Sequence, residues 1–221
     1  GITKKNLDFF KKEILKFKIK DVWKINKIEI FSEKSKVNKI LNFKKNKNDL
    51  FYMIKNDKFY ELLNQKLLKS KLFESAVITK DTFYEEIINK KKFDLIINCD
   101  AKNNISKKFF HKKIDKDYYN LAYTTILKHE KLENNIATQI FTEGGPIAFL
   151  PISNTETSVV CSLETKNKKY SNNEVWNLIK KNNPKFKIKE FSKLICFELK
   201  SSSLRNYYYK NILAFGDLLH K

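Results

Sequence analysis

Two short apolar runs in this chain each lead directly into an aspartate. The first, FDLIINC at Phe93–Cys99, precedes Asp100, and the second, ILAF at Ile212–Phe215, precedes Gly216 and Asp217. Runs that are apolar on both faces are typical of buried strands in a parallel sheet, which occurs mainly in α/β folds. Ligands of open α/β sheets bind beyond the carboxyl ends of such strands. The two runs therefore predict an α/β fold in which Asp100 and Asp217 converge on one crevice.

The residues after the second run have properties that suit a ligand. Gly216 has no Cβ, so a bulky group can approach its backbone closely, and the Asp217 carboxylate can accept hydrogen bonds from sugar-type hydroxyls. A helix that begins at Leu218 would direct its free N–H groups at a phosphate. A simple turn is the commoner arrangement after a buried strand, and that alternative stays open at this point.

The rest of the chain predicts helices and strands in a mixed order. Leucines and phenylalanines at helical spacing predict a helix over Thr3–Phe17, with Thr3 as its N-cap, and another over Asp57–Leu68, capped by Asn56. A hairpin is expected between them, and a short antiparallel sheet, a helix and further strands follow. The expected helix of this part lies at Asn173–Asn182, and the segment Phe83–Lys90 is uncertain. The expected strands lie at Lys27–Phe31, Val37–Phe43, Leu50–Ile54, Ala76–Thr79, Tyr119–Leu127, Ile136–Phe141, Ile147–Ile152, Thr157–Leu163 and within Phe186–Lys200.

This order predicts an α/β lobe into which an antiparallel β-sheet lobe is inserted. Residues 1–24, 56–110 and 204–221 are assigned to the α/β lobe. Residues 111–203 form most of the sheet lobe, to which the strands within residues 25–55 are added. Ligand sites favour the interface between such lobes.

The formal charge of +20 first indicates an anionic partner. Arg205 is the only arginine, however, and the lysines are spread along the whole chain. A nucleic-acid reader would use arginine forks, so a lysine-rich proteome bias explains the charge better. The alternative of a basic nucleic-acid-binding module, with lysines on phosphates and tyrosines stacking on bases, stays open. The charge also favours loose association with acidic lipid.

Conventional catalytic and metal-binding patterns are missing from the sequence. His111, His129 and His220 show no metal-ligand spacing, and no serine lies in a nucleophile elbow. If the chain is an enzyme, a cofactor carries the hard chemical step. Each of the three cysteines lies singly in an apolar run, which predicts buried thiols in a reducing, cytoplasmic compartment. No apolar run approaches the ~20 residues of a membrane-spanning helix.

Six segments of the chain resemble the aromatic-ring flavoprotein monooxygenases, and most closely their ubiquinone-biosynthesis hydroxylases. GGPIAFLPI, SVVCS and ILAFGDLLH stand where that branch has G-P-L-A-L-L-P-L, S-V-V-W-S and G-D-A-A-H. Ala137-x-Gln139-x-Phe141 fits its A-x-Q-x-F, and FYMIKNDKFYELL is similar to its G-Y-V-V-E-N-x-x-L. The residues Asp100 to Asn104 stand where the family has D-G-x-N-S.

The resemblance implies an enzyme with FAD in the α/β lobe and a β-sheet over the substrate pocket. NAD(P)H reduces the flavin, and dioxygen supplies the oxygen atom that is transferred to an activated ring. The implied substrate is a polyprenylated phenol, and the implied location is cytoplasmic or peripheral on the inner face of the membrane, with membership of a quinone-biosynthesis complex allowed. Asp217 matches the aspartate on the ribityl chain of FAD, Gly216 its neighbour, and Asp100 the aspartate of the flavin and pyridine-nucleotide region. The implied pocket residues are Gly145, Pro146, Ala148, Leu150 and Pro151.

The chain also departs from the family. With four glycines in the whole sequence, it has no G-x-G-x-x-G, and the H-P-x-x-G-Q-G that follows the last aspartate is missing too. The resemblance therefore predicts an internal fragment that binds FAD poorly by itself. Family positions have also changed at Ala101, Asn104, Lys107, Cys161 and Lys210. A lysine-rich descendant of the family without activity is a third hypothesis.

Overall fold

The structure is a computed structural model that describes residues 1–15, 18–44, 50–76, 93–166 and 168–220. The chain forms two compact units. Unit 1 contains Gly1–Glu74 and Leu121–Glu198, and unit 2 contains Ser75–Asn120 and Leu199–Lys221. Residues 1–24 and 56–74 therefore cluster with the large sheet. The predicted strand Ala76–Thr79 runs into the undescribed part of the chain, and the segment Phe83–Lys90 lies within it.

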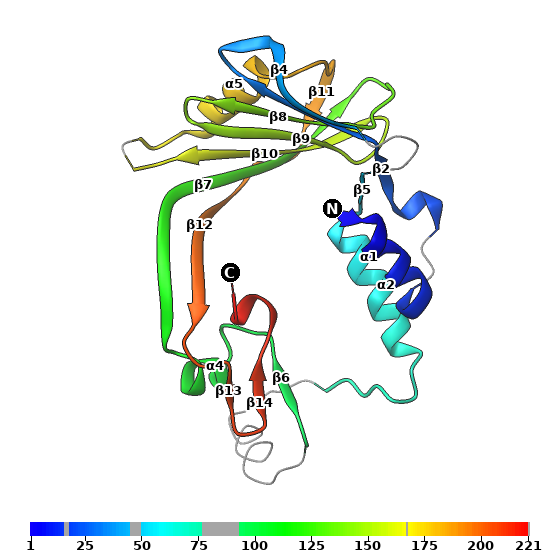
Figure 1. The fold of residues 1–221 in the computed structure, drawn as a ribbon, viewed down its shortest axis with the longest axis vertical. Coiled ribbons are helices and arrows are strands. Elements are labelled where there is room, and N and C mark those ends of the chain that lie inside the picture. Colours follow the sequence, from blue (N-terminus) through cyan, green and yellow to red (C-terminus); the bar gives the residue numbers. More distant parts are fainter. Residues whose placement is uncertain (16–17, 45–49, 77–92, 167, 221) are drawn as a thin grey trace. The chain divides into compact units, whose positions relative to one another are not determined.

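Unit 1 is built around an eight-stranded sheet with the order β11-β7-β10-β9-β8-β3-β4, with β12 also paired to β7 (Figure 1). The predicted hairpin β3–β4 joins this sheet by pairing β3 in parallel with β8, although the two strands lie far apart in the sequence. The neighbouring pairs β8–β9 and β9–β10 are antiparallel, as expected. Strands β7 and β12 also continue into unit 2. The bounds are β3 Lys27–Ser32, β4 Ser35–Lys44, β7 Lys113–His129, β8 Ile136–Thr142, β9 Gly145–Pro151, β10 Glu156–Glu164, β11 Ile188–Phe191 and β12 Ile195–Leu204.

Helix α5 (Asn172–Lys181) covers one face of this sheet and closes the main core. Its buried residues Val175 and Ile179 pack against alternate residues of the strands, among them Phe149 and Val159. The helix begins at a capping box in which Ser171 Oγ accepts from Glu174 N and Ser171 N donates to Glu174 Oε2. The alternation of strand residues therefore gives the sheet one buried face and one half-buried face.

A second, three-stranded sheet of unit 1 has the order β1-β5-β2 and connects to two helices. Thr3 caps α1 by accepting from Asn6 N at 3.2 Å, as predicted, and the helix continues as a π-helix to Ile14. The prediction that Asn56 caps the next helix is wrong: Asn56 is its first residue, and Lys55 stands at the cap without a side-chain bond. The bounds are β1 Ile2–Thr3, α1 Lys4–Phe9, the π-helix Phe10–Ile14, a 3₁₀ turn Ile19–Asp21, β2 Trp23–Ile25, β5 Phe51–Met53 and α2 Asn56–Leu68.

Unit 2 contains a three-stranded sheet with the order β13-β14-β6. A small apolar core that includes Ile105, Phe110, Leu204 and Leu218 packs around Ile212 and Ala214 of its central strand. The bounds are β6 Ile96–Asn98, α4 Asn104–Phe109, β13 Tyr208–Tyr209, β14 Ile212–Ala214 and a 3₁₀ turn Gly216–Leu218. Both units together confirm the mixed α/β fold class.

The prediction of three buried thiols is wrong for two of the cysteines. Cys161 is buried, and burial raises the pKa of its thiol to about 12. Cys99 and Cys196 are exposed, because β6 already ends at Asn98 and the first residues of β12 face solvent.

A buried polar cluster joins β7 to β10 inside unit 1. The Nδ1 of His129 lies 2.8 Å from the carbonyl oxygen of Glu130, which can only accept, so Nδ1 carries the proton. The other ring nitrogen, Nε2, then accepts from Thr157 Oγ1 at 3.0 Å, and Thr157 Oγ1 accepts from Asn134 Nδ2 at 2.9 Å. Thr157 is therefore both a donor and an acceptor at a position that is fully buried.

We expect Thr157→Val to lower the free energy of unfolding by about 1–3 kcal/mol, because valine keeps the shape but removes the donor to the buried His129 Nε2 and one of the acceptors of Asn134 Nδ2. Urea denaturation followed by circular dichroism measures this change. The matched control is Thr124→Val on β7, whose hydroxyl makes no hydrogen bond within the described residues, and its effect should stay within about 0.5 kcal/mol. Equal effects of the two substitutions would contradict the role given to the cluster.

Candidate functional site

Strands β6 and β14 run parallel and in register in unit 2. Their partners are Ile96 with Ile212 and Asn98 with Ala214, and Phe215 N donates to the carbonyl oxygen of Asn98 at 3.0 Å. The two strands therefore end side by side, and the residues that follow leave the same edge of the sheet. The structure thus places Asp100 and Asp217 at a common strand-end edge, which is where the sequence analysis expects them.

The second of these ends is open. Gly216 has a φ of +61°, which favours glycine, and no heavy atom lies within 4 Å of the place where a Cβ would stand. Asp217 is exposed, and its carboxylate makes no hydrogen bond or ion pair within the part of the chain that the structure describes. A free carboxylate beside open backbone can accept bonds from the hydroxyls of a ligand.

The expected helix after Gly216 is not observed. Gly216–Leu218 forms a single 3₁₀ turn, and His220 then pairs with Ser203 in an isolated β-bridge. Leu218, the last residue of the turn, is buried in the small core of unit 2 and holds the turn against it. The phosphate-directed helix N-terminus is therefore replaced by a short turn, and Asp217 is its only charged group.

The first strand end is already organised by internal hydrogen bonds. Asp100 Oδ1 accepts from Lys102 N at 2.7 Å, a turn typical of aspartate, and its main-chain oxygen accepts from Ser106 Oγ. One carboxylate oxygen of Asp100 therefore shapes the loop. The carboxylate remains exposed at the edge of the sheet.

Three residues that the sequence analysis missed hold this loop against β6. Asn103 caps α4 by accepting from Ser106 N at 2.9 Å, and its amide donates to Asn98 Oδ1 at 2.7 Å. The Asn98 amide in turn donates to Ser106 Oγ at 2.8 Å. An asparagine directly before a short amphipathic segment is an N-cap signal, so Asn103 was predictable, whereas the buried partner Asn98 was not.

The implied substrate-pocket residues lie in unit 1, on β9. Strand alternation places Pro146, Ala148 and Leu150 on the half-buried face, opposite the α5 core. Pro151 does not lie there: it is buried opposite Thr157, on the core side. Position 145 requires glycine for a structural reason, because a Cβ there would lie 2.1 Å from the carbonyl oxygen of Ser162. Since Asp100 and Asp217 belong to unit 2, the shared cleft stays a prediction.

The half-buried face of the large sheet is mostly apolar. Cross-strand pairs place Gln139 beside Ala148, and Val160 on the other side of Ala148. Ile30 pairs with Gln139, and Leu41, half exposed, pairs with Ile30. This row offers a mostly apolar surface with one amide.

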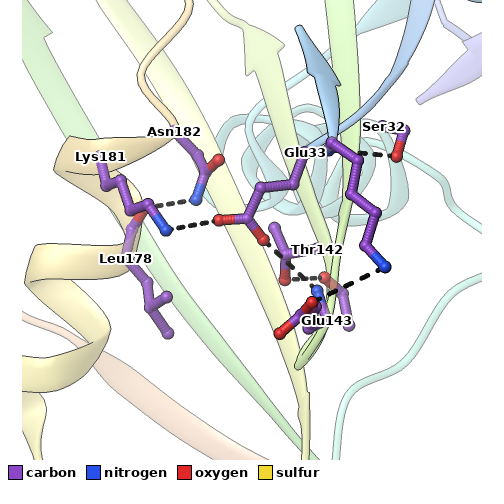
Figure 2. A network of polar contacts seen from close by, with 9 residues as sticks. Ser32, Glu33, Thr142, Glu143, Leu178, Lys181 and Asn182 are labelled. Atoms are coloured by element: carbon purple, nitrogen blue, oxygen red, sulfur yellow. Dashed lines mark hydrogen bonds and ion pairs between the residues drawn. The ribbon is translucent and has the colours of Figure 1, made fainter.

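A charged network lies at one end of the large sheet (Figure 2). Lys181 Nζ on α5 lies 2.7 Å from Glu33 Oε1, whose other oxygen accepts from Glu143 N at 3.4 Å. This carboxylate raises the pKa of Lys181. A cavity of about 470 Å³ beside the network is also lined by Lys168 and Glu174, which pair at 3.1 Å. Because the charged side chains of the network pair with one another, they connect the β3–β4 turn and the β8–β9 turn to α5.

In the described ranges, no group of three or more histidine, cysteine, aspartate or glutamate side chains could hold a metal ion. The expectation that a cofactor would carry the hard chemical step stays a prediction. No helix among the described residues is long and apolar enough to cross a membrane.

Comparisons of sequence find no relative. No protein-family model matches the chain, and no curated protein matches it. Solved structures do match. They include the flavin-dependent brominase Bmp2, with 11% sequence identity and a TM-score of 0.63. The 2-methyl-3-hydroxypyridine-5-carboxylic acid oxygenase matches with 11% sequence identity and a TM-score of 0.60. PqsL, a probable FAD-dependent monooxygenase from Pseudomonas aeruginosa, matches with 11% identity and a TM-score of 0.64.

The chain shares part of the fold of flavin-dependent monooxygenases and halogenases. The three matches cover 91% of this chain, but only 56%, 59% and 62% of the brominase, the oxygenase and PqsL, respectively. The chain thus spans less than two thirds of the length of these structures. At this identity the likeness establishes the fold, and the chemistry has to be argued from the residues.

We expect Asn103→Ala to expose the Ser106 amide, because its cap acceptor is lost, and to weaken local stability by about 1 kcal/mol. Hydrogen exchange at Ser106 measures the effect. Asn103→Asp is the matched control, because it keeps the accepting oxygen and loses only the donor to Asn98. Unchanged exchange in the alanine variant would show that the cap does not hold this loop.

Proposed function

We propose that this chain is part of an FAD- and NAD(P)H-dependent monooxygenase that hydroxylates an aromatic ring. The observation that carries the proposal is the common edge formed by the ends of β6 and β14, with an open glycine and a free carboxylate. The similarity of the fold to flavin-dependent monooxygenases and halogenases also supports the proposal. The ordered motifs of the sequence support it independently.

The residues at this edge fit a flavin cofactor. Gly216 leaves space beside its backbone, and Asp217 has no competing partner within the described residues, so both can meet a ribityl chain. Asp100 would face the flavin and pyridine-nucleotide region while its loop stays fixed by Lys102 N. When bound, FAD would supply the oxygen-transfer chemistry, with NAD(P)H as reductant and dioxygen as co-substrate. The protein's own task is to orient these groups and to exclude water.

The substrate that we propose is a polyprenylated phenol in ubiquinone biosynthesis. The apolar row of Ile30, Ala148 and Val160 supports it, because isoprenoid groups and phenol rings bury well against such a surface. Gln139 lies in the middle of the row and can donate to or accept from a phenolic hydroxyl. Pro146 and Leu150 extend the same face along β9.

We expect the full polypeptide that contains these residues to purify with a flavin absorbance band, and Asp217→Ala to weaken FAD binding by about tenfold or more. The loss of acceptor bonds to ligand hydroxyls is the reason. Fluorescence titration of the apoprotein with FAD measures the affinity.

The control is Asp94→Ala, which removes another exposed aspartate in unit 2 that lies before the start of β6, at the opposite edge of the sheet. Its affinity for FAD should match that of the unaltered protein. A full polypeptide that stays colourless and cannot be reconstituted with FAD would remove the proposal.

A further inference from the structure

A cavity of unit 1 lies between α5 and β11. Its volume is about 590 Å³, which is within the range of small-molecule sites in proteins. We call it the α5–β11 cavity, and its lining includes Asn173, Trp176, Asn177, Lys180, Lys189 and Phe191. The four lining residues from α5 follow one another at helical spacing, so they lie on one face of the helix. That face and β11 therefore meet a ligand together.

Two aromatic rings form an apolar wall of this cavity. Trp176 and Phe191 are half-buried and pack against the main core. Their ring centroids lie 4.5 Å apart, with an angle of 57° between the ring planes. The Nε1 of Trp176 makes no hydrogen bond with any residue that the structure describes, and it is not a fully covered atom. The wall therefore offers ring surface and one N–H donor at positions that core packing fixes.

Two asparagine side chains add further hydrogen-bonding groups to the cavity. Asn173 and Asn177 are exposed, and their amides make no hydrogen bond within the described part of the chain. Each amide has two donor hydrogens and an acceptor oxygen. A hydroxyl group also donates and accepts, so two amides one helical turn apart suit a ligand that carries several hydroxyls.

Two ammonium groups give the cavity a positive charge. Lys180 and Lys189 form no ion pair with any described residue, and Lys180 Nζ lies 5.6 Å from the centroid of the Phe191 ring. Glu190 also lines the cavity, but its carboxylate pairs with Lys128 at 2.9 Å. The cavity beside the charged network differs, because each of its two lysines already pairs with a glutamate.

We propose that the α5–β11 cavity binds a phosphorylated sugar, either free or as the sugar phosphate of a mononucleotide. Lysine ammonium groups bind phosphate through charge-assisted hydrogen bonds. The two amides meet the sugar hydroxyls, and the apolar C–H face of the sugar ring packs on the aromatic wall. Trp176 and Lys180 are four residues apart, about 6 Å along the helix axis, so one small ligand reaches both.

Other ligands use less of this cavity. Inorganic phosphate would meet the lysines but leave the amides and the aromatic wall unused. A purely apolar ligand would cover the amides without giving them partners, which is costly. The inference does not depend on the proposed function, because α5 covers the sheet face opposite the apolar row and the proposed cofactor edge belongs to unit 2.

The test is isothermal titration calorimetry of the full polypeptide with ribose 5-phosphate, AMP and inorganic phosphate. Excess FAD is present, so that AMP does not report on the proposed cofactor edge. We expect both esters to bind, and inorganic phosphate to bind about tenfold more weakly, because it makes the lysine contacts alone. Tighter binding of AMP would assign the ligand to nucleotides and equal binding would assign it to free sugar phosphates, and either result supports the site.

A matched pair of lysine variants locates the phosphate. Lys180→Gln/Lys189→Gln should weaken the binding of both esters by about tenfold or more, because the charge-assisted bonds are lost. Lys66→Gln/Lys131→Gln removes the same charge from exposed positions elsewhere on unit 1 and should bind as the unaltered protein does. All four lysines are exposed, so the variants should fold normally, which circular dichroism checks.

A second pair of variants tests the contacts to the sugar. Asn173→Ala/Asn177→Ala should weaken the binding of both esters and leave that of inorganic phosphate unchanged, because the amides face the hydroxyls. Asn172→Ala, an exposed position of the same helix that does not line the cavity, should change neither. Unchanged ester binding by the double variant would contradict the role of the amides.

Three further results would overturn the proposal. The folded full polypeptide could bind neither ester. The esters could bind no more tightly than inorganic phosphate, which would indicate a general anion site. The control lysine variant could lose as much affinity as the cavity variant, which would indicate diffuse charge attraction. Flavin content is read from the absorbance of the same protein before FAD is added, so failure of this site and failure of the proposed function are distinguishable.

Discussion

The in-register parallel pairing of β6 with β14 is the contact on which the candidate site depends. Parallel strands in register end at the same edge, so the chain can place Asp100 and Asp217 together although they are far apart in the sequence. An antiparallel pairing would send them to opposite edges, and a slip by one residue would turn Ile212 out of the core. The small core around Ile105 and Phe110 fixes the register, because Ile212 and Ala214 are buried against it.

In the large sheet of unit 1, strand alternation turns one set of side chains into the core and leaves the other set half exposed. On β9, Ile147 and Phe149 are fully buried against α5, whereas Ala148 and Leu150 lie half exposed on the other face. The buried face also carries the polar cluster at His129, in which both ring nitrogens have hydrogen-bond partners in the same unit. The stability of the sheet can therefore be disturbed through the buried face without changing the apolar side chains of the other face, on which the proposed substrate would lie.

Local patterns in the sequence predicted the strands, the capped helix α1 and the strand-end aspartates, because apolar runs and cap residues act over short distances. The parallel pairing of β3 with β8 has no local signal, since it joins distant segments by backbone bonds alone. The partners Asn98, Asn103 and Ser106 depend on how a helix returns to a strand end. The differences at Cys99 and Pro151 have simpler causes: β6 ends one residue earlier than the apolar run, and alternation along β9 turns Pro151 to the buried face.

The distance between the two strand ends tests this account most directly. Double electron–electron resonance compares spin labels at Cys99 and at Asp217→Cys with labels at Asp94→Cys and Asp217→Cys, with the other exposed cysteines replaced by serine and Cys161 left buried. Position 94 lies before β6 and position 99 after it. The account predicts that the pair 99 and 217 is closer, by on the order of 10 Å, given ~3.3 Å per strand residue. Equal distances, or a shorter distance from position 94, would contradict it.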